Sequence, residues 1–288
     1  MSKHWLRYAL LTTVAWGLWG AFTSVPSEHG FPDTLTYVVW ALTMVLPATW
    51  AMRRAGWRLQ RDRRSVLLGL VIGLTGAGGQ MILFHAVSIG PTYLIFPIVS
   101  LSPAITIGLS FLLLGERTGR LGVAGIALAL VALPLFDYEP VGGGLTYGMW
   151  FFLSLGIMLA WGIQAYYIKL ANATMSAESI FFYMMITGLM FIPAAWYLTD
   201  FSKPVYLGFS GPYLSACIQI LNAVGALLLV YAFRYGKAIV VSPMINAGAP
   251  LLTALIALGV AGHVPGPYKI AGIGFALSAA LLLALQPE

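Results

Sequence analysis

Long apolar stretches alternate with short charged segments along the whole chain. Lys, Arg, Asp and Glu divide the sequence into nine long uncharged stretches: 8–27, 34–52, 65–115, 121–136, 140–168, 179–199, 205–233, 238–268 and 270–287. A helix crosses the hydrocarbon core of a bilayer in roughly 20 residues. The stretch 65–115 is therefore long enough for two crossings, and Gly90-Pro91 is a turn signal between them. The pattern predicts ten transmembrane helices, at roughly 5–25, 34–52, 65–87, 91–115, 120–136, 146–170, 178–198, 211–233, 238–261 and 267–285.

The fold class predicted from this pattern is an all-α integral membrane protein. Membrane β-strands would be about ten residues long with alternating polarity, and no stretch has that pattern. The composition agrees, because 60% of the residues are hydrophobic and 8% are charged, whereas soluble domains carry about 25% charged residues. Lys3 and Arg7 precede the first helix as they would in a signal peptide. The long apolar core of that helix, with its bulky Trp16 and Trp19, predicts instead that it is retained.

The placement of Lys and Arg predicts the orientation of the helices. If the N-terminus is inside, the inner segments hold Lys3, Arg7, Arg53, Arg54, Arg58, Arg61, Arg63, Arg64, Arg117, Arg120, Lys169, Arg234 and Lys237. The outer segments hold only Lys203 and Lys269. Basic residues concentrate on the cytoplasmic side of membrane proteins, so both termini are expected in the cytoplasm and the protein in the cytoplasmic (inner) membrane. The arginines between residues 53 and 64 are interpreted as facing anionic lipid, not nucleic acid.

The sequence of the first half recurs in the second half. Ala15-Trp16-Gly17 matches Ala160-Trp161-Gly162, Gly90 and Pro97 match Gly236 and Pro243, and Gly125-Ile126 matches Gly272-Ile273. Five is an odd number, so the second unit of five helices enters the membrane from the opposite side. The predicted domains are therefore a five-helix repeat over residues 1–139 and an inverted five-helix repeat over residues 140–288. Many secondary transporters have this architecture, with the substrate site near the midplane.

Together with Leu114-Gly115-Glu116 at the end of the fourth helix, this pattern resembles the drug/metabolite transporter superfamily of the EamA type. The resemblance covers essentially the whole chain and implies ten helices and the export of small metabolites. The second unit departs from the motif, because Gly259-Val260-Ala261-Gly262-His263 stands where the first has Leu-Gly-Glu. The aromatic content of the expected site is also similar to exporters of aromatic amino acids of the YddG type.

Enzyme and cofactor motifs are missing from the sequence. No Gly-Lys-Ser/Thr occurs, which argues against a nucleotide-binding P-loop. His4, His29, His85 and His263 are scattered, and no Asp or Glu lies at the centre of a predicted helix. The sequence therefore predicts no metal, no cofactor and no catalytic residues. Glu116 is expected to serve as an interfacial cap or ion pair.

Tryptophans at the centres of two repeat-equivalent helices are the first candidate binding residues. One face of the first helix carries Thr12, Trp16, Trp19 and Thr23, and the sixth helix carries Trp161 and Gln164 at matching positions. Tryptophan usually lies at membrane interfaces, and an indole N–H near the midplane needs a partner or water. Two interpretations stay open, packing between helices and the lining of a substrate cavity.

The third and eighth helices supply amides. Gln80 follows the small residues Gly73, Gly76 and Ala77 on one face, and the eighth helix carries Gln219 and Asn222. A buried amide must be hydrogen bonded, either between helices or to a solute. His85 and Tyr231 are repeat equivalents that lie well around their helices from this face, so they are predicted as gate or rim residues.

Prolines mark the fourth and ninth helices as candidate hinges. Proline frees the carbonyl one turn before it, which suits both a kink and an ammonium group. The hinge candidates are Pro97, Pro103, Pro243 and Pro250, and Ser100 and Asn246 beside them are candidate substrate ligands. A merely kinked packing helix is the alternative.

The function predicted from these features is a secondary transporter that exports small amphipathic metabolites by alternating access. Amino acids, aromatic ones above all, are the favoured substrates, because indoles suit an apolar ring while amides and free carbonyls suit a zwitterion. A multidrug exporter of flat organic cations is the alternative within transport. A channel, from another class, would need a continuous polar pore. The expected partners are the small-molecule substrate and the lipid bilayer, without nucleic acid, and a monomer is plausible.

Overall fold

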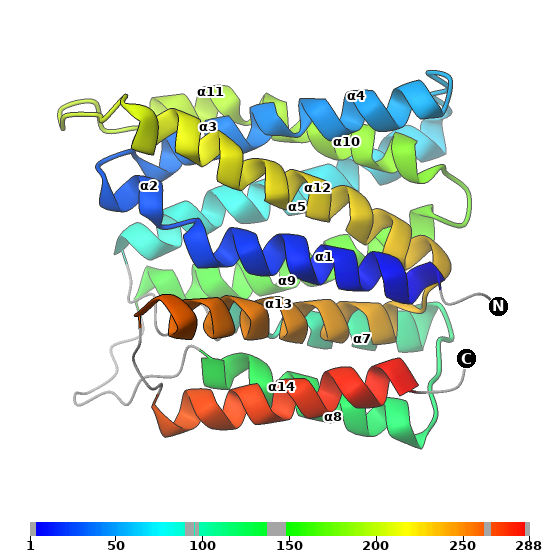
Figure 1. The fold of residues 1–288 in the computed structure, drawn as a ribbon. Coiled ribbons are helices and arrows are strands. Elements are labelled where there is room, and N and C mark those ends of the chain that lie inside the picture. Colours follow the sequence, from blue (N-terminus) through cyan, green and yellow to red (C-terminus); the bar gives the residue numbers. More distant parts are fainter. Residues whose placement is uncertain (1–3, 90–94, 96–97, 137–147, 262–265, 286–288) are drawn as a thin grey trace.

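The computed structural model describes residues 4–89, 95, 98–136, 148–261 and 266–285, and all regular structure in them is helical (Figure 1). The helices of the first half are α1 His4–Phe22, α2 Val25–Glu28, α3 Asp33–Thr43, α4 Val45–Arg54, α5 Arg63–Ile89, α7 Ser102–Leu113 and α8 Arg120–Phe136. Those of the second half are α9 Met149–Ala171, α10 Ala177–Met190, α11 Ile192–Tyr197, η1 Phe209–Tyr213, α12 Leu214–Tyr235, α13 Ala238–Ala261 and α14 Pro267–Leu285. The predicted all-α fold is confirmed.

Four of the predicted positions lie outside the described residues. They are the turn at Gly90-Pro91, Pro97, His263 and the expected boundary between the repeats at residues 139 and 140. Of the predicted helix 91–115, the structure gives α7 and the short turn before it.

The second and seventh predicted spans are each broken into two helices. The expected helix 34–52 divides at Met44 into α3 and α4, and the expected helix 178–198 divides at Phe191 into α10 and α11. Pro47 and Pro193 stand in the first turn after each break, and proline cannot donate the backbone hydrogen bond that would continue the preceding helix. The two prolines are 146 residues apart, so the breaks belong to the repeat.

The packing of the helices follows the repeat. The pair α1 and α12 corresponds to the pair α9 and α5, and the pair α3 and α12 corresponds to α10 and α5. α8 packs against its own equivalent α14 at the edge of the bundle (Figure 1). Helices of one half therefore pack mainly against helices of the other half.

The two repeats run in opposite directions. The start of α1 and the end of α9 lie at the same end of the bundle, because Trp5 packs on Gly236 and Lys169 donates to the carbonyl of Gly236. This end, called the terminal end, carries the start of α1, the end of α14 and the segments 55–62, 114–119, 172–176 and 236–237 (Figure 1). The opposite, distal end carries residues 23–32 and 198–208.

Side-chain contacts obey the same pseudo-twofold relation. Thr106 Oγ1 of α7 donates to the carbonyl of Gly162 of α9 at 3.1 Å. Its equivalent Thr253 Oγ1 of α13 donates to the carbonyl of Gly17 of α1 at 2.9 Å. These bonds join the fourth span to the sixth and the ninth span to the first, so the inversion holds at the level of single atoms.

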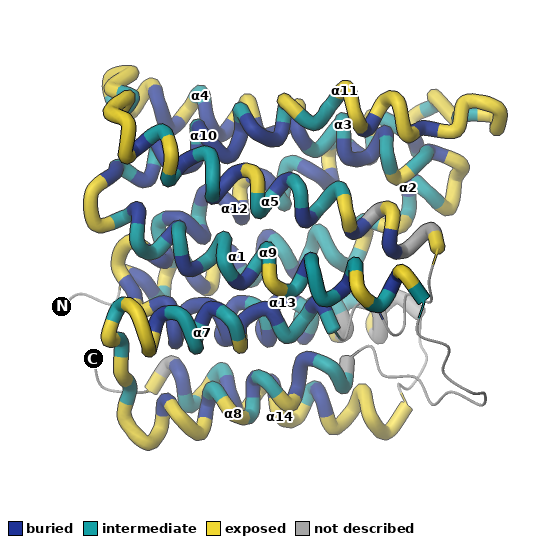
Figure 2. The backbone as a smooth tube through the Cα atoms, turned by 180° about the vertical axis from the view of Figure 1, so that it is seen from behind, coloured by how far each residue is buried: buried dark blue, intermediate teal, exposed yellow. Residues whose placement is uncertain are grey.

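The surface of the bundle suits a bilayer. Among the described residues, five helical segments are long and apolar enough to cross a membrane: Asp33–Arg54, Arg63–Leu83, Met149–Ala171, Ala177–Tyr197 and Phe209–Tyr235. Shorter apolar helices accompany them at Ser102–Leu113, Arg120–Leu135, Ala238–Thr253 and Pro267–Leu283. Exposed residues line α8 and α14 at one edge (Figure 2), and many of them are large and apolar, such as Val123 and Leu281. The protein is a multi-span membrane protein.

Candidate functional site

The tryptophan face of α1 packs against α12, and its polar groups find partners there. The indole N–H of Trp16 donates to the backbone carbonyl of Asn222 at 3.2 Å. The indole N–H of Trp19 donates to Oε1 of Gln219 at 2.9 Å. Gln219 is buried, and its Nε2 donates to Oγ1 of Thr23 at 3.4 Å. The predicted face therefore forms a hydrogen-bonded layer between α1 and α12.

A third tryptophan joins this layer from α3. The indole N–H of Trp40 donates to Oδ1 of Asn222 at 2.8 Å, and its ring lies 5.1 Å from that of Tyr37. Asn222 thus accepts two indoles, one on its backbone and one on its side chain. The sequence pattern did not single out Trp40, although a tryptophan well inside the predicted span 34–52 is the signal that selected Trp16.

The second repeat places its tryptophan in the equivalent position. Trp161 of α9 donates its indole N–H to the carbonyl of Gly76 of α5 at 3.3 Å, and its ring lies on Gly79. The ring of Trp16 lies in the same way on Gly225, the repeat equivalent of Gly79. Glycine is needed at both positions, because a Cβ there would overlap the indole. The pair α1 and α12 and the pair α9 and α5 are therefore held together by the same kind of contact, a tryptophan ring packed on a glycine.

Three amide groups of the predicted set keep unused hydrogen-bonding capacity. Among the described residues, the amides of Gln80 and Gln164 and the Nδ2 of Asn222 have no hydrogen-bond partner. All three side chains are half-buried, and an amide left unpaired in such a place costs free energy. These amides can bind a polar solute, whereas Trp16, Trp19 and Trp161 can offer only their ring faces.

The predicted hinge at α7 has a different form from the one expected. Pro103 is the second residue of α7, where a missing N–H is tolerated. It therefore begins a helix instead of bending one, and it is buried. Ser100 is half-buried in the turn before α7.

In α13 both prolines lie inside a continuous helix. Pro243 and Pro250 interrupt its hydrogen bonds. Asn246, between them, donates from Nδ2 to the carbonyl of Ser242 at 2.9 Å. The amide nitrogen of Asn246 is thus turned back onto its own helix, and its role as a substrate ligand stays a prediction.

His85 and Tyr231 lie at opposite ends of the bundle, as the inversion requires of repeat equivalents. His85 is exposed at the distal end of α5. Tyr231 lies near the terminal end of α12, where its hydroxyl donates to Oε1 of Glu178 at 2.5 Å. Its ring stacks on that of Tyr8 at 5.1 Å. The structure therefore brings neither residue to the tryptophan layer.

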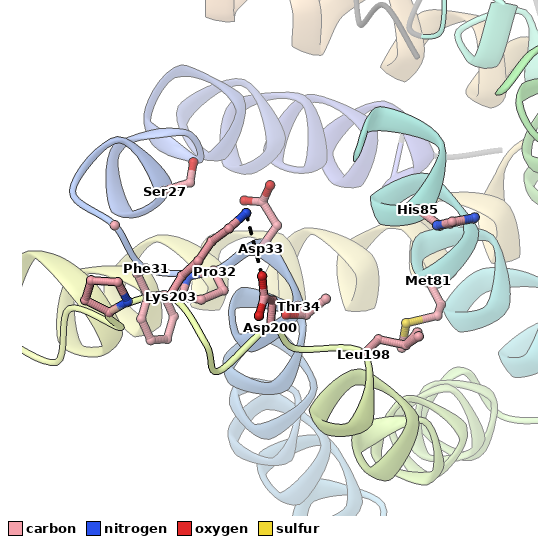
Figure 3. Close-up of a pocket in the computed structure, with 12 residues that line it drawn as sticks. Ser27, Phe31, Pro32, Asp33, Thr34, Met81, His85, Leu198, Asp200 and Lys203 are labelled. Atoms are coloured by element: carbon pink, nitrogen blue, oxygen red, sulfur yellow. Dashed lines mark ion pairs between the residues drawn. The ribbon is translucent and has the colours of Figure 1, made fainter. Parts of the chain in front are cut away.

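A cavity of about 470 Å³ lies at the distal end, between the turn after α2, the end of α5 and residues 198–204 (Figure 3). This volume is within the usual range of small-molecule pockets, about 300–1,000 Å³. Its polar lining includes Asp33, His85, Asp200 and Lys203, and its apolar lining includes Phe31, Met81 and Leu198. Met81 packs in one cluster with Tyr37 and Trp40. The cavity thus borders the tryptophan layer on its distal side.

A polar junction lies at the terminal end. Glu116 accepts the Ile239 N–H at the start of α13 at 3.1 Å, and its Oε1 lies 3.8 Å from Nζ of Lys169. Lys169 donates to the carbonyls of Phe233 at 3.0 Å and Gly236 at 2.5 Å. Burial raises the pKa of Glu116, against the lowering effect of the Ile239 N–H and Lys169. Glu116 is both a cap and an ion-pair partner, and it ties together the α7–α8 loop, α9 and α13.

Known proteins resemble this chain in both sequence and fold. The profile of the EamA-like transporter family matches residues 3–136 and 148–285. The pseudopaline exporter CntI of two strains of Pseudomonas aeruginosa is 28% identical over 195 residues, which cover 66% of this chain and 65% of the exporter. The match thus spans just under two thirds of the length of these relatives. One solved crystal structure of a protein superimposes with a TM-score of 0.76 over 97% of this chain and 98% of that chain, at 17% identity, and shows the fold alone.

Proposed function

The chain belongs to the EamA-like transporter family, whose profile matches both of its halves, and on that premise we propose that it is a secondary transporter that exports a small amphipathic metabolite by alternating access. The observation that carries this proposal is the layer of tryptophan rings and unused amides in the middle of the bundle. Its rings suit an apolar group, and the amides of Gln80, Gln164 and Asn222 suit a polar one.

The two ends of the bundle support alternating access. A cavity lies at the distal end, while Glu116 and Lys169 join helices of both repeats at the terminal end. In such a cycle the helices of the two repeats are joined at one end of the bundle while a cavity opens at the other, and these contacts and this cavity support one such state. The name of the Pseudomonas relatives, an exporter, supports the outward direction.

Amino acids with aromatic side chains are the proposed substrates. The protein is proposed to lie in the cytoplasmic (inner) membrane, with both chain termini in the cytoplasm. The proposed orientation rests on the basic residues, which gather at the terminal end, such as Arg53, Arg58 and Arg117. The repeats are proposed to move as two units, 1–139 and 140–288.

The test is transport of labelled L-phenylalanine and L-leucine by the purified protein in proteoliposomes. Trp16→Ala and Trp161→Ala should both reduce phenylalanine transport by about two- to tenfold, since each removes an aromatic contact worth about 0.5–1.5 kcal/mol. Trp196→Ala, at a side chain that is 58% exposed, is the matched control and should leave transport unchanged.

Two results would contradict the proposal. One is unchanged selectivity between phenylalanine and leucine in both tryptophan variants at normal protein yield. The other is transport of flat organic cations with no transport of amino acids, which would favour a multidrug exporter.

A further inference from the structure

The two carboxylates of the distal cavity differ in their partners. Asp200 is paired with Lys203, Nζ to Oδ2 at 3.7 Å (Figure 3). Asp200 Oδ1 also accepts the Ser202 N–H at 3.0 Å and the Ser202 hydroxyl at 2.5 Å. Asp33 lines the same cavity and is exposed, and within the described part of the chain no Lys, Arg or His forms an ion pair with it. Asp33 has a side-chain hydrogen bond with Ser27 but no ion pair in the described part of the chain, so its charge is the one that is available to a cationic ligand.

The charge of the lining favours a cation. Its ionisable groups are Asp33, Asp200, Lys203 and His85. Two carboxylates face one ammonium group in this lining, so acidic groups outnumber the lysine in a cavity that is partly shielded from water. Such a site attracts cations and repels anions.

The apolar lining lies beside Asp33. Tyr37 and Trp40 follow Asp33 by four and seven residues on one face of α3, and seven residues span about 10 Å along a helix. Met81 lines the cavity and packs in the same cluster as Tyr37 and Trp40. Phe31, Met81 and Leu198 are the apolar side chains that line the cavity itself, and Tyr37 and Trp40 lie behind Met81. A ligand that fits this lining has a cationic group at one end and an apolar body about the size of an aromatic ring.

We propose that the distal cavity is a binding site for organic ammonium solutes, with Asp33 as the counter-ion of the ammonium group. The inference rests on the proposed function in one respect, that the solute held there is the transported one. The cavity then forms a second station, on the distal side of the tryptophan layer. The carboxylate of Asp33 recognises the amino group, which amino acids share with simple amines.

The test measures protection of a cysteine in the cavity. Cys217 is the single cysteine and is exposed, so the background is Cys217→Ser with Leu198→Cys as the reporter. Leu198 lines the cavity and is 57% exposed, so it is readily accessible to N-ethylmaleimide. Phenethylamine, an aromatic ammonium without a carboxylate, should slow this modification, and 3-phenylpropionate, its anionic counterpart, should not.

Substitutions then assign the effect to one carboxylate. Asp33→Asn should raise the phenethylamine concentration for half-protection by about tenfold or more, the factor expected for one lost charge-assisted contact. Asp33→Glu, which keeps the charge, should restore protection to within about threefold, and Asp200→Asn, the matched control, should change it by less than that.

Three results would overturn the inference: no protection by phenethylamine, equal protection by 3-phenylpropionate, or equal effects of Asp33→Asn and Asp200→Asn. Asp33 also begins α3, where a carboxylate favours the helix dipole. A purely capping role would lower the melting temperature of Asp33→Asn and leave protection unchanged. Because protection is measured without transport, failed amino-acid transport with intact protection would refute the proposed function alone.

Discussion

Replacing Gly162 by alanine should separate two helices that enclose the tryptophan layer. A methyl group at Gly162 of α9 would lie 2.5 Å from Cβ of Ile105 and 2.8 Å from the carbonyl oxygen of Ser102, both on α7. The Ser102 carbonyl is backbone and cannot rotate away, so α7 must shift. The shift would also strain the hydrogen bond from Thr106 to the Gly162 carbonyl.

The magnitude follows from two opposing terms. Overpacking of this kind costs about 1–3 kcal/mol, while alanine is favoured over glycine inside a helix by roughly 0.5–1 kcal/mol. The expected net loss is about 1–2 kcal/mol, which lowers the melting temperature by roughly 2–8 °C at about 2–4 °C per kcal/mol. Gly17→Ala, the repeat equivalent, would bring a methyl group to 2.7 Å from Cβ of Leu252 and should have a similar effect.

Gly156→Ala in the same helix is the matched control. No atom lies within 4 Å of the Cβ position at Gly156, so only the helix propensity changes and the melting temperature should rise slightly. The assay is thermal unfolding of the purified protein in detergent, with transport measured in parallel. If Gly162→Ala and Gly156→Ala shift the melting temperature equally and in the same direction, the close contact of α7 and α9 does not exist in the protein.

Further outcomes follow from other parts of the molecule. In a Cys217→Ser background, an impermeant maleimide added outside intact cells should label Ser202→Cys and not Arg58→Cys, and the reverse labelling would invert the proposed topology. An imposed pH gradient should not drive uphill substrate accumulation, because no Asp or Glu was found at the centre of a predicted span; accumulation abolished by His85→Ala would contradict this. Hydrogen bonds from Ser65 hold the pKa of Asp62 below its usual value, so its stabilising contribution is present above about pH 4 and is lost as pH falls through the lowered pKa. Asp62→Ala should therefore lower the melting temperature at pH 7, and a difference that fails to shrink in acid would show that the hydrogen bonds from Ser65 to Asp62 do not stabilise the fold.

The positions of the helices and the inverted repeat could be predicted from the sequence. The length of an uncharged stretch is a direct requirement of the bilayer. The match of Trp16 with Trp161 in the sequence corresponds to equivalent contacts in the structure, because each indole donates to a backbone carbonyl and lies on a repeat-equivalent glycine. The positions of the charged residues do not predict the breaks at Met44 and Phe191, because Pro47 and Pro193, which mark these breaks, lie inside uncharged stretches.

The partners within the site could not be predicted. The bond from Trp40 to Asn222 joins helices 182 residues apart in sequence, and no local pattern encodes it. For the same reason the sequence leaves open whether Trp16 packs or lines a cavity, and the structure adds that its N–H donates to the carbonyl of Asn222. The distal cavity is formed by side chains of three separate segments, so only the folded chain reveals it.

The matched hydrogen bonds of Thr106 to Gly162 and Thr253 to Gly17 mean that the sequence carries two copies of one joint. Because the two copies point in opposite directions, exchanging the conformations of the two repeats would preserve both hydrogen bonds. It would also move the cavity from the distal end of the bundle to the terminal end. The pair of Glu116 and Lys169 breaks that equality, because Ser24 stands at the repeat equivalent of Lys169. An ion pair of this kind can therefore form at the terminal end and not at the equivalent place of the distal end, so different contacts hold the helices together at the two ends of the bundle.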